Sequence, residues 1–365
     1  DKCMDKAVWH VHGVHVMTPA VSVIIPAYNA AQTLAASVAS AQRQSCREIE
    51  ILIVDDGSTD DTAAIAGHLA AADPRICLMR QANRGVAHAR NSAIRQAAGA
   101  YVAMLDADDL WHPDKLARQL DRFATAPVGT GLVYCWFRRI DFDDRVIPGA
   151  PYPRVEGAVL HRHLEWNFIS TGSTPMVPTP LAAAIGYDEG LDDEGRLGCE
   201  DYLFQLQIAR MHGFACTPAF LTGYRRGGKS FSTQTEKMIH SHLRMYQKVV
   251  PSLPESPAIA EILARRRAQL LVSRTRNRLN ARQPVVAARY LMQAIQACPW
   301  RVPGYLRQEF SALMGGGSRG VPVPASTRGF DDFVAEERDG PWASARDPRY
   351  LVWLAEQDGV AGDPY

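Results

Sequence analysis

Three carboxylates stand within four residues in the stretch "LDADDLW", at Asp106, Asp108 and Asp109. Like charges this close repel each other and raise each other's pKa. A bound divalent cation removes that conflict, and hard oxygen ligands from few protein groups suit Mg²⁺ or Mn²⁺ shared with a diphosphate. The structural alternative is that Asp108 or Asp109 caps a helix with Pro113 at its first position. The spacing therefore predicts a metal-diphosphate site, with a helix cap as the alternative.

A second chemical motif lies in "TGYRRGGKSFST", where Gly223, Gly228, Lys229 and Ser230 have the spacing of a phosphate-binding P-loop. A working P-loop is a tight glycine-rich turn between a buried strand and a helix, and its amides wrap a phosphate. Here the interior of the loop would hold the bulky residues "YRR", and the polar "SFSTQTEK" follows where a buried helix is expected. A nucleotide hydrolase or kinase built on this loop is therefore the alternative hypothesis.

The elements that must position these motifs alternate between apolar strands and helices. Strands are expected at 21–25, 48–54, 75–81, 101–105 and 131–141, and helices at 30–44, 60–72, 85–99, 112–126 and 200–213. Asn29 is expected to cap the first helix, and two acids should lie in the first turn of the second. This alternation implies right-handed crossovers and a mainly parallel sheet, which defines an α/β fold.

Polar residues collect directly after the first four strands, in "PAYN", "DDGSTD", "ANRG" and "DADD". Ligands of open parallel sheets bind outside the carboxyl ends of the strands, so these four segments should share one site. No G-x-G-x-x-G follows the first strand, which argues against a dinucleotide enzyme. The spacing in "DDGSTD" also differs from that of a calcium loop. No glycine- and basic-rich activation loop follows the first strand, which argues against a nucleotidylyltransferase.

Together these motifs resemble the family 2 glycosyltransferases, which have the GT-A fold. The matching text is "VSVIIPAYNA", "EILIVDDGSTDDT", "NRGVAHARNSAI", "YVAMLDADDLWHPDKL" and "CEDYLFQLQIA", which covers roughly 21–232 in the family's order. The resemblance implies a Rossmann-like, mainly parallel sheet flanked by helices, followed here by a helical carboxyl-terminal extension. It implies an inverting transfer of a sugar from a nucleotide sugar to a glycan, glycolipid or glycoprotein acceptor.

The resemblance also implies roles at matching positions. The nucleotide would contact Pro26, Ala27, Tyr28, Asn29, Asp56, Asn83, Gly85, Arg90, Asp106, Ala107 and Asp108. Asp56 would accept the imide N–H of a uracil or thymine, which favours a UDP- or dTDP-sugar. Asp108 would hold the metal ion, and Asp106 would reach the metal or the ribose.

Asp201, in "CEDYL", matches the family's catalytic base. An acceptor hydroxyl must lose its proton as it attacks the anomeric carbon, and one carboxylate must take that proton. Glu200 would place a second carboxylate on the same side of the pocket as Asp201, where it would hydrogen-bond the acceptor. Trp166 is a possible sugar-stacking ring, with a core position as the alternative, and 167–177 would form part of the acceptor wall. The alternative for Glu200 and Asp201 is that both acids only satisfy the helix dipole.

The P-loop-like segment also fits the family, where a "YR" pair precedes a loop of small residues that ends in serines. In that interpretation Arg225, Lys229 and Ser230 belong to a mobile cationic flap that steadies the leaving diphosphate. No γ-phosphate is then involved. A non-catalytic nucleotide-sugar-binding module is the third hypothesis, which the presence of Glu200 and Asp201 disfavours.

The expected organisation is a disordered leader at 1–17, a catalytic domain at 18–235, a helical extension at 236–300 and a tail of unclear structure at 301–365. The catalytic domain divides into a nucleotide-binding half at about 18–141 and an acceptor half at about 142–235. Arginines crowd 265–289 with almost no acids. This stretch is either a solvated helix face or a peripheral contact with anionic lipid.

Composition excludes several classes. The net charge of +1 gives no bulk attraction for nucleic acid, and no nucleic acid partner is expected. Seven scattered cysteines without a C-x-x-C pair suggest neither a zinc site nor a disulfide framework, which favours a reducing cytoplasm. No apolar run is long enough to span a bilayer. The expected location is the cytoplasm, with the inner face of the membrane as the site of any lipid contact.

Overall fold

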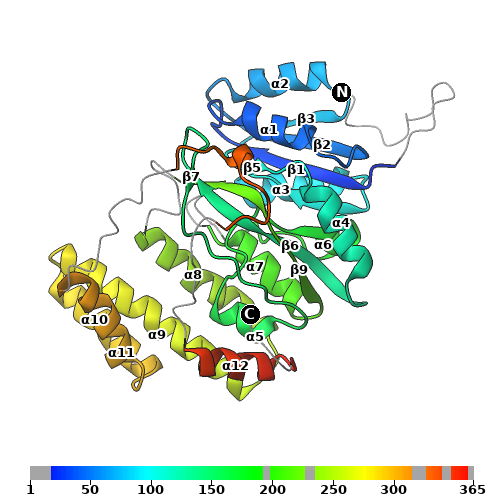
Figure 1. The fold of residues 1–365 in the computed structure, drawn as a ribbon. Coiled ribbons are helices and arrows are strands. Elements are labelled where there is room, and N and C mark those ends of the chain that lie inside the picture. The colour runs from blue at the N-terminus through cyan, green and yellow to red at the C-terminus, as the bar shows by residue number, and fades with distance from the viewer. Residues whose placement is uncertain (1–17, 192–197, 227–234, 315–325, 339–346, 361–365) are drawn as a thin grey trace.

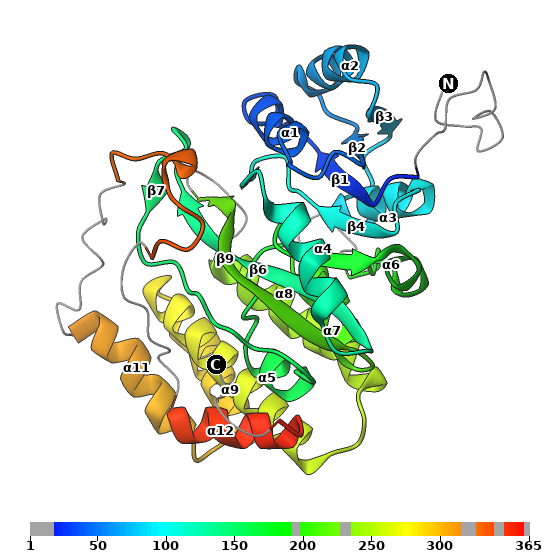
Figure 2. The same cartoon turned by 45° about the vertical axis from the view of Figure 1, so that its right-hand side comes forward.

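The computed structural model describes residues 18–191, 198–226, 235–314, 326–338 and 347–360. The strands in these ranges form one mixed sheet in the order β3-β2-β1-β4-β8-β6-β9-β5, with β7 paired to β6 (Figure 1). Helices cover the sheet, and a group of carboxyl-terminal helices packs below it in Figures 1 and 2. The predicted leader at 1–17 lies outside the described residues.

The amino-terminal half of the sheet is parallel, as predicted. Its strands are β1 (Val21–Ala27), β2 (Ile49–Asp56), β3 (Ile76–Gln81) and β4 (Tyr101–Met104). Its helices are α1 (Leu34–Gln42), α2 (Thr62–Ala72) and α3 (Val86–Gln96). Every residue of β1 is buried, and alternate side chains enter two cores: Val23 packs with α1, whereas Ile24 packs with α3. This two-sided burial explains why β1 is continuously apolar rather than alternating.

The second half of the sheet is mixed. It contains β5 (Leu110–Trp111), β6 (Thr130–Ile140), β7 (Val146–Ile147), β8 (Met176–Pro178) and β9 (Gly213–Arg225). The helices here are α4 (Lys115–Thr125), α5 (Leu160–Glu165), α6 (Thr179–Ile185) and α7 (Glu200–Ala209). Strand β8 runs antiparallel to β4 and β6, while β6 and β9 pair in parallel. The sheet thus continues past β4, and α7 leads directly into β9 of this second half.

Three local predictions were wrong. Asn29 does not cap α1, because the helix begins at Leu34 after Thr33. The expected acids lie before α2 rather than in its first turn. One of them, Asp60, accepts a hydrogen bond from the Thr62 amide at 3.0 Å. Helix α4 begins after Asp114, so Pro113 is not its first residue.

The carboxyl-terminal part is helical further along than the sequence predicted. Its elements are α8 (Thr235–Val249), α9 (Pro257–Asn280), α10 (Pro284–Ala297), α11 (Val302–Met314), a short 3₁₀ turn (Phe330–Asp332) and α12 (Pro348–Gln357). Helix α12 is anchored to α5 because Asp358, at the end of α12, accepts a hydrogen bond from Arg162 Nε of α5 at 2.8 Å. Within the described part of the chain, no helix is both long and apolar enough to cross a membrane. The predicted domain boundaries stay predictions.

Candidate active site

The loops after β1 and β2 are tied together at the carboxyl edge of the sheet. Asn29 Oδ1 accepts a hydrogen bond from the Thr59 amide at 2.8 Å, and the Asn29 amide donates to Ser58 Oγ at 3.0 Å. Asn29 holds a left-handed backbone (φ 50°), and Tyr28 before it is 52% exposed. The loop therefore presents an aromatic ring to solvent at the edge where a nucleotide is expected.

Asp56 organises the next loop. Its buried carboxylate accepts hydrogen bonds from the Arg84 amide at 3.0 Å, the Gly85 amide at 2.8 Å and Gln81 Nε2 at 2.7 Å. A carboxylate has about four acceptor positions, so one is left for a ligand N–H. Gly85 has φ 87° at the start of α3, a conformation that favours glycine, and exposed Asn83 lies beside it. Asp56 thus fixes the turn predicted to contact the nucleotide.

Arg90 joins the two acidic clusters. Its buried guanidinium bonds Asp106 Oδ1 at 2.7 Å and Glu200 Oε1 at 2.6 Å, and it lies over the ring of Tyr187. Burial opposes the charge, but the two carboxylates outweigh it and raise the pKa of Arg90 well above its usual value. The sequence resemblance placed Arg90 at the nucleotide. In the structure Arg90 bridges the turn at 106–108, called the metal turn because it carries the predicted metal ligands, and the predicted base helix, where Glu200 lies 110 residues from Arg90 in sequence.

The predicted metal ligands fit a hard divalent cation. Ala107 is buried and holds the turn in the core, whereas Asp108 is exposed and makes no ion pair with any described residue. Asp106 Oδ1 accepts from Arg90, and no side chain that the structure describes hydrogen-bonds to Oδ2, so this oxygen can take a ligand. Although part of the Asp108 side chain is exposed, desolvation by the protein around its carboxyl group and the charge of Asp106 raise its pKa to about 6. No cluster of three metal-binding side chains occurs among the described residues, so further ligands would come from a diphosphate and water.

Asp109, the third acid of the motif, has a structural role. It is fully buried, and its carboxylate accepts hydrogen bonds from the Arg225 amide at 2.9 Å and from Thr171 Oγ1 at 3.3 Å. Burial and the neighbouring acids raise the pKa of Asp109 well above its usual value. Asp109 therefore caps no helix; it locks the metal turn to the end of β9.

Arg225 was predicted to contact the diphosphate, and its geometry argues against that role. The buried guanidinium donates from Nε to the Asp108 carbonyl at 2.7 Å, from Nη1 to the Asp141 carbonyl, and from Nη2 to Asp144 Oδ1 at 2.5 Å. All three nitrogens are thus engaged by protein groups. Arg225 positions the main chain of the metal turn. Lys229 and Ser230 lie outside the described residues.

The P-loop hypothesis is contradicted at its first glycine. Gly223 lies within β9, where it pairs with Leu110 of β5 and Arg138 of β6. The strand continues to Arg225, so the first three residues of the motif are extended and hydrogen-bonded in a sheet. A phosphate cradle requires those residues to form a turn with free amides. The motif match is accidental.

The predicted base lies at the start of α7. Cys199, the residue before the helix, has a left-handed backbone (φ 76°), a strained conformation that is typical of functional sites. Burial and the charge of Glu200 raise the pKa of Asp201 to about 7, although Arg90 opposes the shift. A carboxyl group near this value can accept a proton at neutral pH. Glu200, which was predicted to bind the acceptor, accepts a hydrogen bond from Arg90 with one of its two carboxylate oxygens.

Gly172 marks the space that these groups share. A β-carbon added to it would lie 3.3 Å from Arg90 Nη2, 3.6 Å from Asp106 Oδ2 and 3.8 Å from Asp201 Cβ. The same segment supports the metal turn, because Ser173 Oγ accepts a hydrogen bond from the Asp106 amide at 3.0 Å. The sequence assigned 167–177 to the acceptor wall but gave no signal for Gly172 itself.

We expect Gly172→Val to lower turnover about 100-fold, because misplacing reacting groups by about 1 Å costs that much. The added methyl groups would push into the space between Asp106 and Asp201. Gly67→Val is the matched control, since nothing lies within 4 Å of a β-carbon there. Steady-state kinetics with a thermal melt of each variant would test this. Equal activity of the two variants would show that Gly172 does not border the reacting groups.

Trp166 remains an untested prediction for acceptor binding. Its ring is partly buried and lies edge-on to Phe168, with centroids 5.9 Å apart. Both rings pack on the main hydrophobic core beside α5. These contacts fit the core position that the sequence left open.

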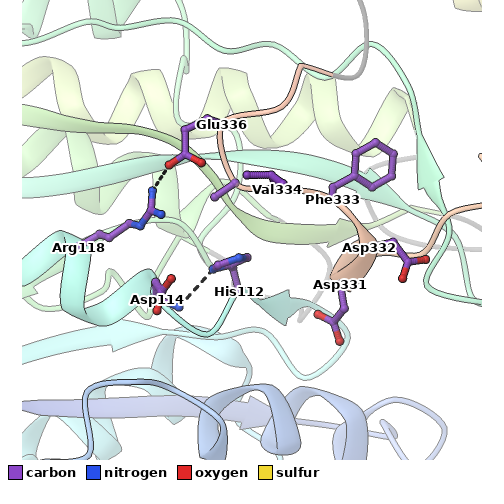
Figure 3. A pocket seen from close by; sticks show the side chains of 9 residues that line it. His112, Asp114, Arg118, Asp331, Asp332, Phe333, Val334 and Glu336 are labelled. Atoms are coloured by element: carbon purple, nitrogen blue, oxygen red, sulfur yellow. Dashed lines mark hydrogen bonds and ion pairs between the residues drawn. The ribbon is translucent and has the colours of Figure 1, made fainter.

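Figure 3 shows a pocket of about 340 Å³ elsewhere in the molecule. It lies between the start of α4 and the segment 331–336, and its wall contains His112, Asp114 and an ion pair of Arg118 with Glu336. None of the strand-end residues lines it. This pocket is therefore separate from the candidate active site.

The sheet and its flanking helices have the GT-A fold. The structure is similar to Staphylococcus aureus TarS 1–349 in complex with UDP-GlcNAc, with a TM-score of 0.59 and 21% identity over 80% of this chain and 86% of that one. It is also similar to the mannosyltransferase PcManGT from Pyrobaculum calidifontis in complex with GDP-Man and Mn²⁺, with a TM-score of 0.56 and 23% identity over 86% of each chain.

Residues 22–169 match the model of "Glycosyl transferase family 2". Among characterised relatives, chondroitin synthase of Escherichia coli is 39% identical over 182 residues, which is 47% of this chain and 26% of that protein. The chain thus spans about a quarter of that relative's length. The matched segment, residues 22–169, is a glycosyltransferase family 2 domain, as the sequence resemblance implied.

Proposed function

We propose that this chain is an inverting, metal-assisted glycosyltransferase that moves a sugar from a nucleotide sugar to a hydroxyl of a glycan, glycolipid or protein-linked acceptor. The observation that carries the proposal is the meeting of Asp106, Arg90 and Asp201 around Gly172. A transfer of this kind needs acids under the phosphates and a separate carboxylate across the pocket. The similar folds that bind UDP-GlcNAc and GDP-Man support a nucleotide-sugar donor.

In the proposed reaction Asp201 acts as the base. The acceptor oxygen forms a bond to the anomeric carbon, its proton passes to an Asp201 oxygen, and the bond from that carbon to the diphosphate breaks. A single displacement inverts the configuration at the anomeric carbon. Arg90 holds Glu200 and Asp106 at the two sides of the reacting centre.

Asp108 and Asp106 would hold Mg²⁺ or Mn²⁺ in this proposal. The bound ion would neutralise charge that develops on the leaving diphosphate. The Mn²⁺ of PcManGT supports a divalent ion in this fold. The exposed carboxylate of Asp108 and Oδ2 of Asp106 are the donors that such an ion prefers.

Asp108→Ala is expected to remove the dependence of donor binding on the metal ion. Titration calorimetry with Mn²⁺ and a nucleoside diphosphate would measure it, and Mn²⁺ binding can be followed separately by electron paramagnetic resonance. Asp143→Ala, in another exposed acidic turn, is the matched control. Unchanged metal dependence in Asp108→Ala would refute the ligand assignment.

The favoured donors are UDP- and dTDP-sugars, because Asp56 has one acceptor position left for an imide N–H. Titration of the chain with UDP, dTDP, GDP and ADP in the presence of Mn²⁺ would test this preference. Tighter binding of UDP or dTDP supports it. Tighter binding of a purine diphosphate would show that Asp56 only fixes the loop at Gly85.

A further inference from the structure

The arginine-rich stretch predicted to contact lipid is largely occupied by contacts within the protein. Arg274 and Arg278 both pair with Glu236 of α8, at 2.8 and 2.7 Å. Arg276 pairs with Glu309 of α11, and Arg265 is buried over the ring of Tyr350. These arginines hold α9 to its neighbours. The lipid contact predicted for 265–289 therefore cannot rest on this face of α9.

Helix α10 presents a different face to solvent. Its buried side, with Ala287 and Ala294, packs against α9. Its exposed side carries the apolar side chains Val285, Met292 and Ile295, of which Val285 is 82% exposed and Met292 56%. The exposed polar residues Arg289 and Gln296 lie among them. The outward face of a surface helix is normally polar, so this mixture of basic and exposed apolar side chains is the pattern of a helix that lies at a boundary between water and an apolar layer.

The residues just before and just after α10 add a further exposed arginine and an exposed aromatic ring. We use the name α10 surface for Arg282, Val285, Arg289, Met292, Ile295 and Trp300. Trp300, just after the helix, is 70% exposed. Arg282 and Arg289 are exposed and form no ion pair with any residue that the structure describes. Figure 1 shows α10 on the outer side of α9, at the end of the molecule away from β1–β3.

The charge pattern identifies the occupant. Between Glu261 and Glu309 the sequence contains ten arginines and no acid. A symmetric contact between two copies would bring Arg289 of one copy near that of the other, without a nearby acid to neutralise them. An anionic lipid surface instead offers negative headgroups to the arginines and an apolar layer to Met292 and Trp300. Tryptophan is the side chain favoured at such an interface.

We propose that the α10 surface docks on an anionic membrane surface. The apolar side chains enter the boundary between headgroups and acyl chains, while Arg282 and Arg289 face the headgroup phosphates. This contact is peripheral and leaves the site at Asp106 and Asp201 free for its ligands. The proposal does not rest on the enzymatic activity.

Sedimentation with vesicles tests the proposal on the full chain. We expect binding to vesicles of phosphatidylcholine with phosphatidylglycerol, and far weaker binding to phosphatidylcholine alone. The double variant Arg282→Gln with Arg289→Gln should bind on the order of 25-fold more weakly, since each basic residue near the surface contributes about fivefold. Met292→Ser with Trp300→Ser should also weaken binding. All these residues are exposed, so the thermal midpoint should stay unchanged.

The matched control combines Arg47→Gln with Met211→Ser, which removes an exposed arginine and an exposed methionine elsewhere. It should bind vesicles like the unaltered chain. Equal loss in the control and the α10 variants, or no preference for the anionic vesicles, would overturn the proposal. Light scattering would reveal the other occupant: a dimer that Met292→Ser with Trp300→Ser dissociates would assign the surface to a second copy.

Discussion

Replacing Asp201 by asparagine is expected to lower sugar transfer by about 100- to 10,000-fold, the usual contribution of a general base. The amide has nearly the same shape, but it cannot take the acceptor proton. Donor affinity should change little, because the predicted nucleotide contacts lie on other loops. Transfer rates with calorimetry of donor binding measure the two quantities separately. Normal transfer by this variant would mean that the base is misassigned.

The pH dependence gives a second test of the same residue. Because the pKa of Asp201 is raised to about 7, transfer by the unaltered chain should increase as the pH rises towards 7 and then level off. The folded state holds this proton more tightly than the unfolded state, so ionisation of Asp201 costs stability as the pH rises from about 4 to 7. Asp201→Asn should therefore melt at a higher temperature than the unaltered chain at pH 8. At pH 4 the two chains should melt at about the same temperature.

Asp121→Asn is the matched control, because Asp121 is an exposed acid on α4 outside the site. It should keep the transfer rate, the pH profile and the melting temperature of the unaltered chain. A stabilisation of Asp201→Asn that is equal at both pH values would show that burial does not raise the pKa of this carboxyl.

Replacing Arg90 by methionine is expected to have the largest effect on stability. Removing one partner of a buried ion pair typically costs about 3 kcal/mol or more, because the remaining charge has no partner. Here two carboxylates, Asp106 and Glu200, would lose theirs. Transfer should fall together with stability, because the metal turn and α7 would lose the side chain that joins them. Denaturant unfolding and steady-state kinetics measure the two losses.

A double variant separates charge from packing. Arg90→Met with Glu200→Gln removes one of the unpaired charges, so it should recover part of the lost stability without recovering the rate. Arg90→Lys keeps the charge, but a single ammonium cannot bridge two carboxylates as a guanidinium does. We expect an intermediate stability for Arg90→Lys. A double variant no more stable than Arg90→Met would show that the ion pair with Glu200 does not dominate.

The strand-end loops could be predicted from the sequence because their positions follow from local patterns. Continuous apolar runs such as "VSVII" define buried strands, and parallel strands bring their carboxyl ends to one edge. Asp56, Asp106 and Asp108 therefore fell at the correct edge of the sheet. The helix boundaries were less accurate, since Asn29 and Pro113 have the right residue types for a helix start but serve loops instead.

The partners of individual side chains could not be predicted, because they depend on pairings across long sequence separations. Arg225 looked like a cationic loop residue, yet it contacts Asp108 across 117 residues and Asp144 across 81. Gly172 carries no side chain, so only the fold reveals that it borders Arg90 and Asp201. The P-loop spacing was equally misleading, because a short motif does not say whether Gly223 lies in a turn or a strand.

The most direct test of the proposed activity is nucleoside diphosphate release from a panel of nucleotide sugars with Mn²⁺ or Mg²⁺. The acceptor need not be known, because slow donor hydrolysis can be measured without it. We expect release from at least one UDP- or dTDP-sugar, and its loss in Asp108→Ala. Release from no sugar donor, together with ATP or GTP turnover that Lys229→Ala abolishes, would contradict the proposed glycosyltransferase.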